Sequence, residues 1–417
     1  MVVTLLLRAL PVFISAFAAG LFACVISAQA QNAGASLVAP PRSIADISAN
    51  LEREKPDPAA RAKILADADA NVSGTGASGA EQLMNRARAR AAVGRGKDAV
   101  VDAEAAIKMA NAANVDYGEV VSRYEVVLVR LLRATGDPKR AVSILENQIK
   151  ALQNNYKGRL FSLNHQLVIA LLNLGDINRA EVYARNNRTL LTQSREWKRP
   201  DLDPVRTYWA SDVEDSNARV FDARGRYADA EQSYRRARDL MADAQRQSVR
   251  WPTRPARDTF GSASDWMLAF EGRAKARQGR VTEGEADVRR ALIGRLTAAG
   301  KYHGDTAGIL AILCWVLGEQ GRQQEAEKIA IEIEGIYRQL GQPDDSRAIV
   351  NTRLLLASTL NMQRCFEDAA EVYRSVDRAT VNWPPAQREA AVNSASRVNA
   401  LLSSNNTTDA DSVDMSA

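Results

Sequence analysis

The residue types that most often carry out chemistry are scarce in this sequence. Among its 417 residues are two histidines, His165 and His303, and three cysteines, Cys24, Cys314 and Cys365. Two histidines leave little for His-based catalysis or a His-rich metal site, and three cysteines are too few for a disulfide scaffold or a Cys-rich zinc site. We therefore predict a protein that is not an enzyme and that holds no metal and no cofactor.

Arginine is the other side chain that could act here, because its planar guanidinium binds carboxylates through two hydrogen bonds. Lysine and arginine total 55 residues against 50 acidic ones, which gives a net charge of +5. A basic chain of this kind can bind nucleic acid or an anionic surface. The excess is small for the length and the bases are mixed with acids, so we predict no nucleic-acid partner; steep salt dependence of DNA binding would reverse this view.

The composition indicates which elements position these side chains. Hydrophobic residues make up 46% of the chain and aromatic residues only 6%, and alanine and arginine are abundant. Alanine and arginine are good helix formers, whereas strands favour β-branched and aromatic residues. The composition predicts an all-α fold.

A short pattern recurs along the chain at intervals between 39 and 54 residues. Each copy has a glycine, a turn, and a small residue five positions later, with arginine replacing the glycine in the last copy. The anchors are Gly94, Gly136, Gly175, Gly225, Gly279, Gly321 and Arg364. Residues seven positions before each anchor are small or modest in size, as close contact between two helices requires. Seven copies predict seven helical hairpins.

The flanking residues indicate how each hairpin is built. After Gly321, apolar residues follow the i, i+3, i+4, i+7 spacing of one helix face. The glycine suits a left-handed residue at the end of the first helix. Asp137 and Pro138 fit an N-cap and a first helical residue, and Thr282 with Glu285 fits a capping box.

These features together resemble the tetratricopeptide repeat. The fourth copy matches the family pattern at all its small, turn and aromatic positions, Ala218, Gly225, Ala230, Tyr234 and Ala237. The longer spacing is similar to that of kinesin light chains. The resemblance covers residues 80–402 and implies a right-handed α-solenoid of about seven antiparallel hairpins that binds protein partners in a concave groove.

A narrower resemblance concerns the secreted repeat region of bacterial proteins that carry a C-terminal CHAT domain, a caspase-like module. It rests on several stretches, such as Glu54-Lys-Pro-Asp-Pro58, Lys157-Gly-Arg-Leu-Phe161 and Gly300-Lys-Tyr-His-Gly-Asp-Thr306. No strand–helix alternation typical of that module follows the repeats. The resemblance therefore implies the array without protease activity, and an alternative function as a regulatory or targeting repeat fragment of such a protease system.

The tetratricopeptide resemblance also implies which side chains face the groove. One groove position holds four arginines, Arg88, Arg130, Arg219 and Arg273. Nearby groove positions hold Arg123, Arg133, His165 and Arg277. We predict that the four arginines form a ladder that binds an acidic segment or a chain-terminal carboxylate. The alternative is a solvated face with local ion pairs.

Two insertions between hairpins carry tryptophans beside arginine and proline, at Trp197 and Trp251. Such a tryptophan can anchor a protein partner. The alternative is that each tryptophan folds back over the neighbouring hairpin and seals its core.

Residues 1–30 are predicted to be a signal peptide. Arg8 is their one charge, an apolar stretch follows, and Ala28-Gln29-Ala30 fits cleavage after Ala30. Alternatives are an uncleaved transmembrane anchor and lipidation at Cys24. Cleavage implies a periplasmic or secreted protein. Residues 31–79 are predicted to hold two short helices and a flexible linker, and residues 403–417 a disordered tail.

The remaining reactive residues are expected to have structural roles. Cys314 occupies the small contact position and is expected to be buried. Cys365 is expected at a turn, so a disulfide between these two cysteines is not predicted. His303 is expected to pack or cap between two repeats.

Overall fold

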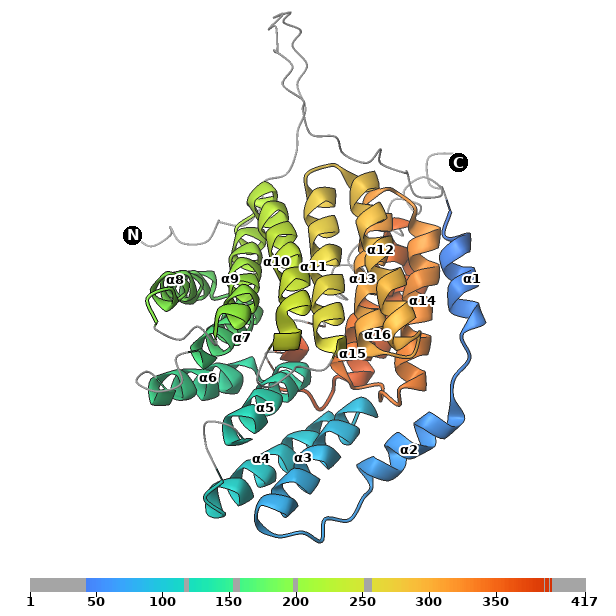
Figure 1. Ribbon diagram of the computed structural model, residues 1–417. Helices are drawn as coiled ribbons and strands as arrows, with labels where there is room; N and C mark the ends of the chain where they lie inside the picture. Colours follow the sequence, from blue (N-terminus) through green and yellow to red (C-terminus); the bar gives the residue numbers. More distant parts are fainter. Residues whose placement is uncertain are drawn as a thin grey trace, which may run out of the picture. The chain divides into compact units, whose positions relative to one another are not determined.

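The computed structural model describes residues 43–115, 120–152, 158–197, 202–250, 257–385, 387–389 and 391. Contacts divide the chain into Met1–Leu37 and Val38–Ala417, and all described residues lie in the second unit. All regular secondary structure in these described ranges is helical (Figure 1). The predicted signal peptide and tail lie outside the described residues.

In the described part of the chain, seven antiparallel hairpins form the predicted all-α solenoid. Each pairs a first helix with a second helix, and their bounds are α3 (Gly76–Ala92) with α4 (Gly96–Ala112), α5 (Ser122–Thr135) with α6 (Pro138–Leu152), α7 (Arg159–Asn173) with α8 (Ile177–Ser194), α9 (Asp203–Ala223) with α10 (Tyr227–Gln247), α11 (Arg257–Arg277) with α12 (Val281–Ala299), α13 (Gly304–Glu319) with α14 (Gln323–Gln339), and α15 (Arg347–Met362) with α16 (Phe366–Ala379). A short 3₁₀ helix, η3 (Ser248–Arg250), follows α10.

The seven predicted turns coincide with the seven hairpin connections. All six glycine anchors have positive φ, between 74° and 91°. Arg364, the anchor without glycine, adopts the same conformation with φ of 63°. Left-handed backbone disfavours a residue with a Cβ, so the seventh turn keeps this geometry at a cost in strain.

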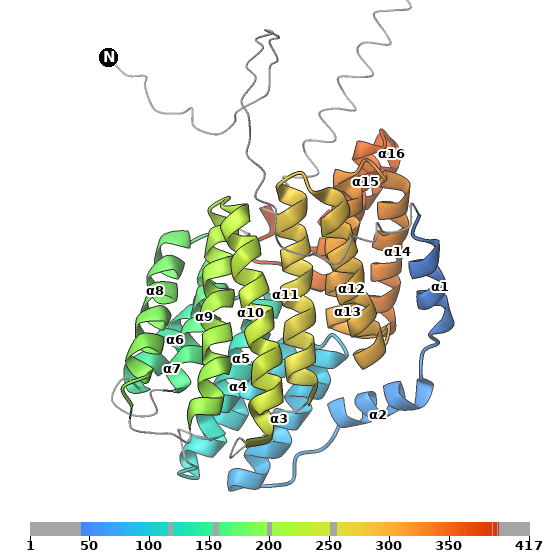
Figure 2. The ribbon, with the colours of Figure 1, turned by 45° about the horizontal axis from the view of Figure 1, so that its top comes forward.

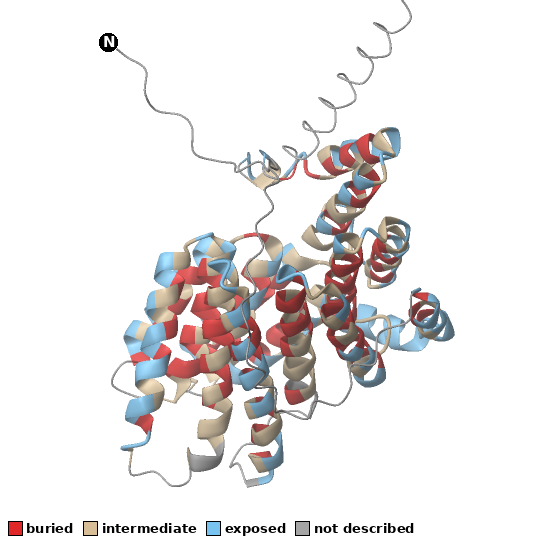
Figure 3. Ribbon diagram, turned by 90° about the horizontal axis from the view of Figure 1, so that it is seen from above, coloured by how far each residue is buried: buried red, intermediate tan, exposed pale blue. Residues whose placement is uncertain are grey.

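The two small positions of each repeat lie where its helices meet. The alanines five residues after the anchors are fully buried, as are the small residues seven before them, including Cys314 at 1% exposure. In the fifth hairpin both positions are glycine: a Cβ on Gly272 would lie 2.6 Å from the carbonyl oxygen of Gly284. The backbones of the two helices therefore approach closely there. Figure 3 shows the buried residues along the sides where helices meet.

The predicted N-cap of α6 is confirmed, because the Asp137 carboxylate accepts a hydrogen bond from the Arg140 N–H at 3.1 Å. The predicted capping box of α12 is wrong. The helix begins at Val281, so Thr282 lies inside it, and its N-cap makes no side-chain hydrogen bond. Glu285 is buried and accepts instead from Arg289 at 2.8 Å.

Two short helices precede the array, α1 (Ala45–Arg53) and α2 (Pro58–Ala68). Apolar residues of α1, among them Ile47 and Leu51, are buried in the core of α12, α13 and α14. From there α2 runs towards α3, so the N-terminal helices connect the sixth hairpin with the first (Figures 1 and 2). The helix α3 begins at Gly76, within the stretch predicted as linker.

The first two hairpins also touch the end of the array directly. A Cβ on Gly94 would lie 2.7 Å from the Cα of Gln342, in the connection between α14 and α15. The Gln387 side chain donates to the carbonyl oxygen of Gly136 at 2.6 Å. The array therefore curves until its two ends meet.

Candidate functional site: a polar band on the first helices

A continuous band of polar and aromatic side chains crosses five first helices, α5, α7, α9, α11 and α13. The helix α7 lies against α9, and α11 lies against α13. Side-chain contacts from one first helix to the next, with the charge of Arg130 beside Arg133 and His165, define what we call the first-helix band: Arg130, Arg133, His165, Asp215, Arg219, Asp222, Phe270, Arg273, Arg277 and Trp315.

His165 joins α7 to α9 within this band. Its Nδ1 lies 3.0 Å from the Ser216 hydroxyl and its Nε2 lies 3.4 Å from the Asp215 carboxylate. Burial lowers the pKa of His165 to about 4, so the ring is neutral at pH 7. On α9, burial and then the charge of Asp215 raise the pKa of Asp212 to about 8. Both groups are held in their uncharged forms.

Two of the four predicted groove arginines are neutralised within the protein. Arg219 donates to Asp215 at 2.7 Å, and Arg273 donates to Asp222 at 2.7 Å. Both guanidinium groups lie 4.8 Å from the ring centre of Phe270, an arrangement that adds cation–π attraction. For these two residues the alternative interpretation, local ion pairs, describes what the structure contains.

Arg277 extends the same arrangement to α13. It donates to the other carboxylate oxygen of Asp222 at 2.7 Å and lies 5.6 Å from the ring centre of Trp315. One carboxylate therefore serves two arginines at this end of the band.

At the other end of the band, the described residues place positive charge without a neighbouring carboxylate. Arg133 is half-buried and donates to the neutral side chain of Gln166 at 3.0 Å. Its Nε is buried without a hydrogen-bond partner among the described residues. Burial, Arg219 and Arg130 together lower the pKa of Arg133 to about 10, because each disfavours its charged form. Arg130 is exposed and pairs with no acid in the described ranges.

The predicted ladder is therefore only partly assembled. Arg130, Arg219 and Arg273 belong to one band, but Arg88 on α3 donates to Asn85 at 2.9 Å and has no contact with the other three among the described residues. The sequence alone did not predict that the carboxylates of Asp215 and Asp222 and the ring of Phe270 contact two of these arginines. Asp215 was detectable as the residue four before Arg219 on one helix.

Trp197 packs in a cluster with side chains of α7 and α9 and does not project freely into solvent. Its ring lies 5.9 Å from that of Trp209 in an edge-on arrangement, and Trp209 stacks on Phe161 at 4.7 Å. This is the sealing arrangement given above as the alternative. A partner-binding role for Trp197 stays a prediction, and Trp251 lies outside the described residues.

The remaining reactive residues have the structural surroundings expected of them. Cys314 is buried, which raises the pKa of its thiol to about 12. Cys314 and Cys365 are both free thiols. His303 caps α13, since its Nδ1 accepts from the Asp305 N–H at 3.1 Å.

The described part of the chain contains no group of three or more His, Cys, Asp or Glu side chains arranged to hold a metal ion. Within the same ranges, no helix combines the length and apolar character needed to cross a bilayer.

No family model matches this sequence, and no curated protein matches it. Several solved structures are similar in fold. BtubC (BKLC) from P. vanneervenii is 16% identical, covers 65% of this chain and 91% of its own, and has a TM-score of 0.37. A tetratricopeptide repeat protein from Parabacteroides merdae is 14% identical, covers 76% and 98%, and has a TM-score of 0.39.

A third structure is a Signal Transduction ATPase with Numerous Domains protein with a tetratricopeptide repeat sensor, from Pyrococcus horikoshii. It is 11% identical, covers 85% of this chain and 52% of its own, and has a TM-score of 0.44. With identities and TM-scores this low, the solenoid assignment rests on the helices and turns of this chain itself.

Proposed function

We propose that this chain is a non-catalytic interaction scaffold that binds an acidic protein segment, or a chain-terminal carboxylate, on the first-helix band. Arg130 and Arg133 anchor the segment. The observation that carries the proposal is the half-buried guanidinium of Arg133, which has like charges beside it and no carboxylate to balance it among the described residues.

The energetics favour an external carboxylate at this point. A buried charge without a partner is costly, and neighbouring cations add to the cost. A carboxylate that docks between Arg130 and Arg133 offsets both terms through charge-assisted hydrogen bonds. The same carboxylate gains less from Arg219 and Arg273, because Asp215 and Asp222 already bind them. Binding energy is therefore expected to concentrate at the α5 end of the band.

A peptide selection tests this proposal. Random decapeptides with free C-termini are displayed and selected against the native chain, an Arg130→Glu variant and an Arg246→Glu control. Arg246 is exposed on α10, and its replacement by glutamate makes the same change of charge outside the band. Acidic sequences should be enriched by the native chain and the control and lost with Arg130→Glu. Enrichment of the same sequences by all three would contradict the proposal.

An Arg133→Gln variant separates a binding role from a structural one. If Arg133 serves the fold, its removal lowers stability. If Arg133 instead serves a ligand and is left without a carboxylate partner in the free protein, the variant raises the free energy of unfolding by about 1 kcal/mol while peptide binding weakens.

We also propose that the chain is exported. The support is the sequence pattern of residues 1–30, with Arg8, an apolar stretch and Ala28-Gln29-Ala30. N-terminal sequencing of protein recovered from the periplasm or medium should give Gln31 as the first residue. Recovery only from membranes with the N-terminus intact would favour the anchored alternative.

A further inference from the structure

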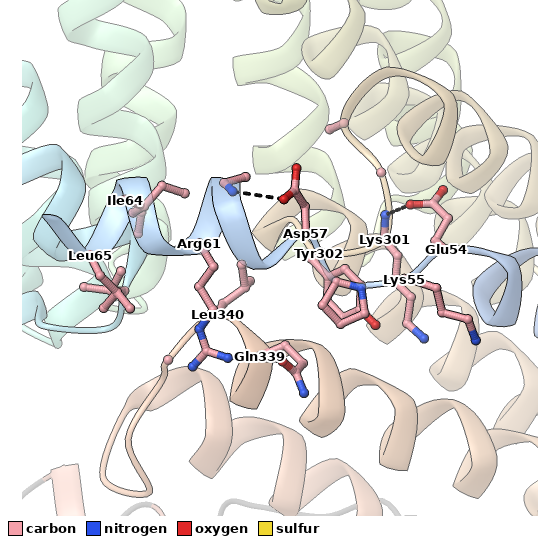
Figure 4. Close-up of a pocket in the computed structure, with 17 residues that line it drawn as sticks. Glu54, Lys55, Asp57, Arg61, Ile64, Leu65, Lys301, Tyr302, Gln339 and Leu340 are labelled. Atoms are coloured by element: carbon pink, nitrogen blue, oxygen red, sulfur yellow. Dashed lines mark hydrogen bonds between the residues drawn. The ribbon is translucent and has the colours of Figure 1, made fainter. Parts of the chain in front are cut away.

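A cavity of about 280 Å³ lies where the two N-terminal helices bridge the first hairpin to the fifth and sixth hairpins. Its walls come from the α1–α2 connection, α2, the α3–α4 turn, the α12–α13 connection and the end of α14 (Figure 4). We call it the seam cavity. Its volume is near the lower limit of about 300–1,000 Å³ for small-molecule sites.

Hydrogen bonds hold the walls of the seam cavity in place. The Glu54 carboxylate accepts from the backbone N–H of Lys301 at 2.6 Å, and the Lys301 ammonium pairs with Glu332 at 2.5 Å. Arg61 donates to the side chain of Gln339 at 3.2 Å. Each bond joins segments more than 30 residues apart or in different hairpins, so the cavity is preformed by the fold.

The interior of the seam cavity is largely apolar. On α2, two adjacent large aliphatic side chains that line the cavity, Ile64 and Leu65, are each 38% exposed. Tyr302 and Leu340 line the same space from the other walls. An apolar ligand here would cover surface that the fold leaves open to water.

The charged groups at the rim differ in their partners. The two carboxylates are hydrogen-bonded to backbone N–H groups: Glu54 accepts from the Lys301 N–H, and Asp57 accepts from the N–H groups of Ala59 and Ala60 at the start of α2. In contrast, Arg61 bonds only the neutral Gln339, and Lys55 has no acidic partner among the described residues. The rim therefore offers two cations to a ligand.

We propose that the seam cavity binds a small anionic amphiphile, an aliphatic or aromatic carboxylate. Its apolar part lies against Ile64, Leu65 and Leu340, and its carboxylate lies at the rim between Lys55 and Arg61. Because the walls come from the first hairpin, the N-terminal helices and the fifth and sixth hairpins, the bound ligand stabilises the contact between them.

Calorimetric titration of the full-length chain tests this inference. The probes are octanoate, the neutral 1-octanol and the cationic octyltrimethylammonium. Two variants target the cavity: Ala60→Trp fills it from an exposed position on α2, and Arg61→Glu reverses the charge at the rim. Lys63→Glu is the matched control, because Lys63 lies on the same helix, pairs with Asp67 in solvent and does not line the cavity.

Octanoate should bind with saturation, roughly tenfold more tightly than 1-octanol, while the cationic probe does not compete. Ala60→Trp and Arg61→Glu should each lose most of this binding, and Lys63→Glu should keep it. The inference is overturned if octanoate does not bind, if Ala60→Trp binds it as the native chain does, or if all three probes bind equally. Circular dichroism of each variant confirms folding, and the peptide selection above is independent of this site.

Discussion

The hairpins from α3 to α8 share one continuous core of alanine, leucine and valine side chains. In the hairpins from α9 to α12 the apolar residues of α9, α10 and the first part of α11 fall into small clusters, and buried charged side chains occupy the space between the helices. Glu271 illustrates the second arrangement, because it is 2% exposed and accepts from Arg235 at 3.0 Å and Arg238 at 2.7 Å.

One repeat pattern therefore supports two kinds of core, one apolar and one with buried ion pairs. An apolar core is stabilised by the burial of surface from water, which is not directional. A core of buried ion pairs depends on every partner being present, because a buried charge without its partner is costly. The band proposed for binding draws most of its charged side chains from α9 and α11, in the second region.

The largest effect is expected from breaking the charged core. Glu271→Ala leaves Arg235, Arg238 and Lys275 without a shared partner and should lower the free energy of unfolding by about 4 kcal/mol. Denaturant titration measures this. The control is Glu371→Ala on α16, whose ion pairs are exposed and should contribute little to stability. Equal losses in the two variants would show that the buried network has no special weight.

Truncation in the apolar core should cost slightly less. Leu145 is fully buried in α6, and Leu145→Ala should lower the free energy of unfolding by about 3 kcal/mol through lost burial and a cavity. The same denaturant titration applies. Val101→Ala, at a position 62% exposed on α4, should change it by no more than about 0.5 kcal/mol. A loss for Leu145→Ala as small as that of its control would contradict a continuous core.

A single methyl group in the fifth hairpin tests the close backbone approach there. Gly272→Ala places a Cβ against the Gly284 carbonyl and should destabilise by about 2 kcal/mol. In Gly335→Ala, within α14, the Cβ meets no atom within 4 Å, so alanine should stabilise the helix by up to about 1 kcal/mol. Thermal unfolding of both variants measures the difference. Effects of the same sign would show that helix propensity, and not the approach, dominates.

The pH dependence of stability should reveal the raised pKa of Asp212. Its pKa is raised to about 8 in the folded chain, against 3.8 as the ordinary value, so the folded state holds a proton that the unfolded state releases. Stability from this group is present below pH 4 and declines as pH rises towards 8, by up to about 1.4 kcal/mol per pH unit.

Asp212→Asn should therefore gain stability relative to the native chain as pH rises from 4 to 8. His165 acts oppositely between pH 4 and 6.5, because its lowered pKa makes the folded state bind fewer protons. Comparison of the two proteins at each pH cancels that contribution. Parallel stability curves would exclude a protonated Asp212.

Much of the hairpin geometry was predictable because it depends on residues near one another in sequence. The left-handed turn at Gly225 and the small contact residue Ala218 follow from spacing alone, and so does the seventh turn, even though Arg364 replaces glycine. The capping box at Thr282 failed because Glu285 serves a neighbouring hairpin, where Arg322 donates to it at 2.9 Å.

The site was less predictable because its contacts cross from one hairpin to the next. The repeat resemblance predicted Arg219 and Arg273 as groove residues, but it could not indicate that Phe270 lies beneath both. It also could not show that Arg133 lacks a carboxylate while Arg219 has one. Such pairings depend on how successive hairpins stack, which no single repeat encodes. The seam cavity was not predictable from local patterns, because its walls come from segments that are far apart in the sequence.

Direct titration of the first-helix band tests the central claim. A fluorescein-labelled decapeptide of alternating glutamate and alanine, with a free C-terminus, is followed by fluorescence anisotropy against the native chain, Arg130→Glu and Arg246→Glu. We predict saturable binding that weakens with added salt, falls by at least about tenfold in Arg130→Glu and is retained in Arg246→Glu. Equal affinity for the native chain and Arg130→Glu, or equal binding of a lysine–alanine peptide, would contradict the account.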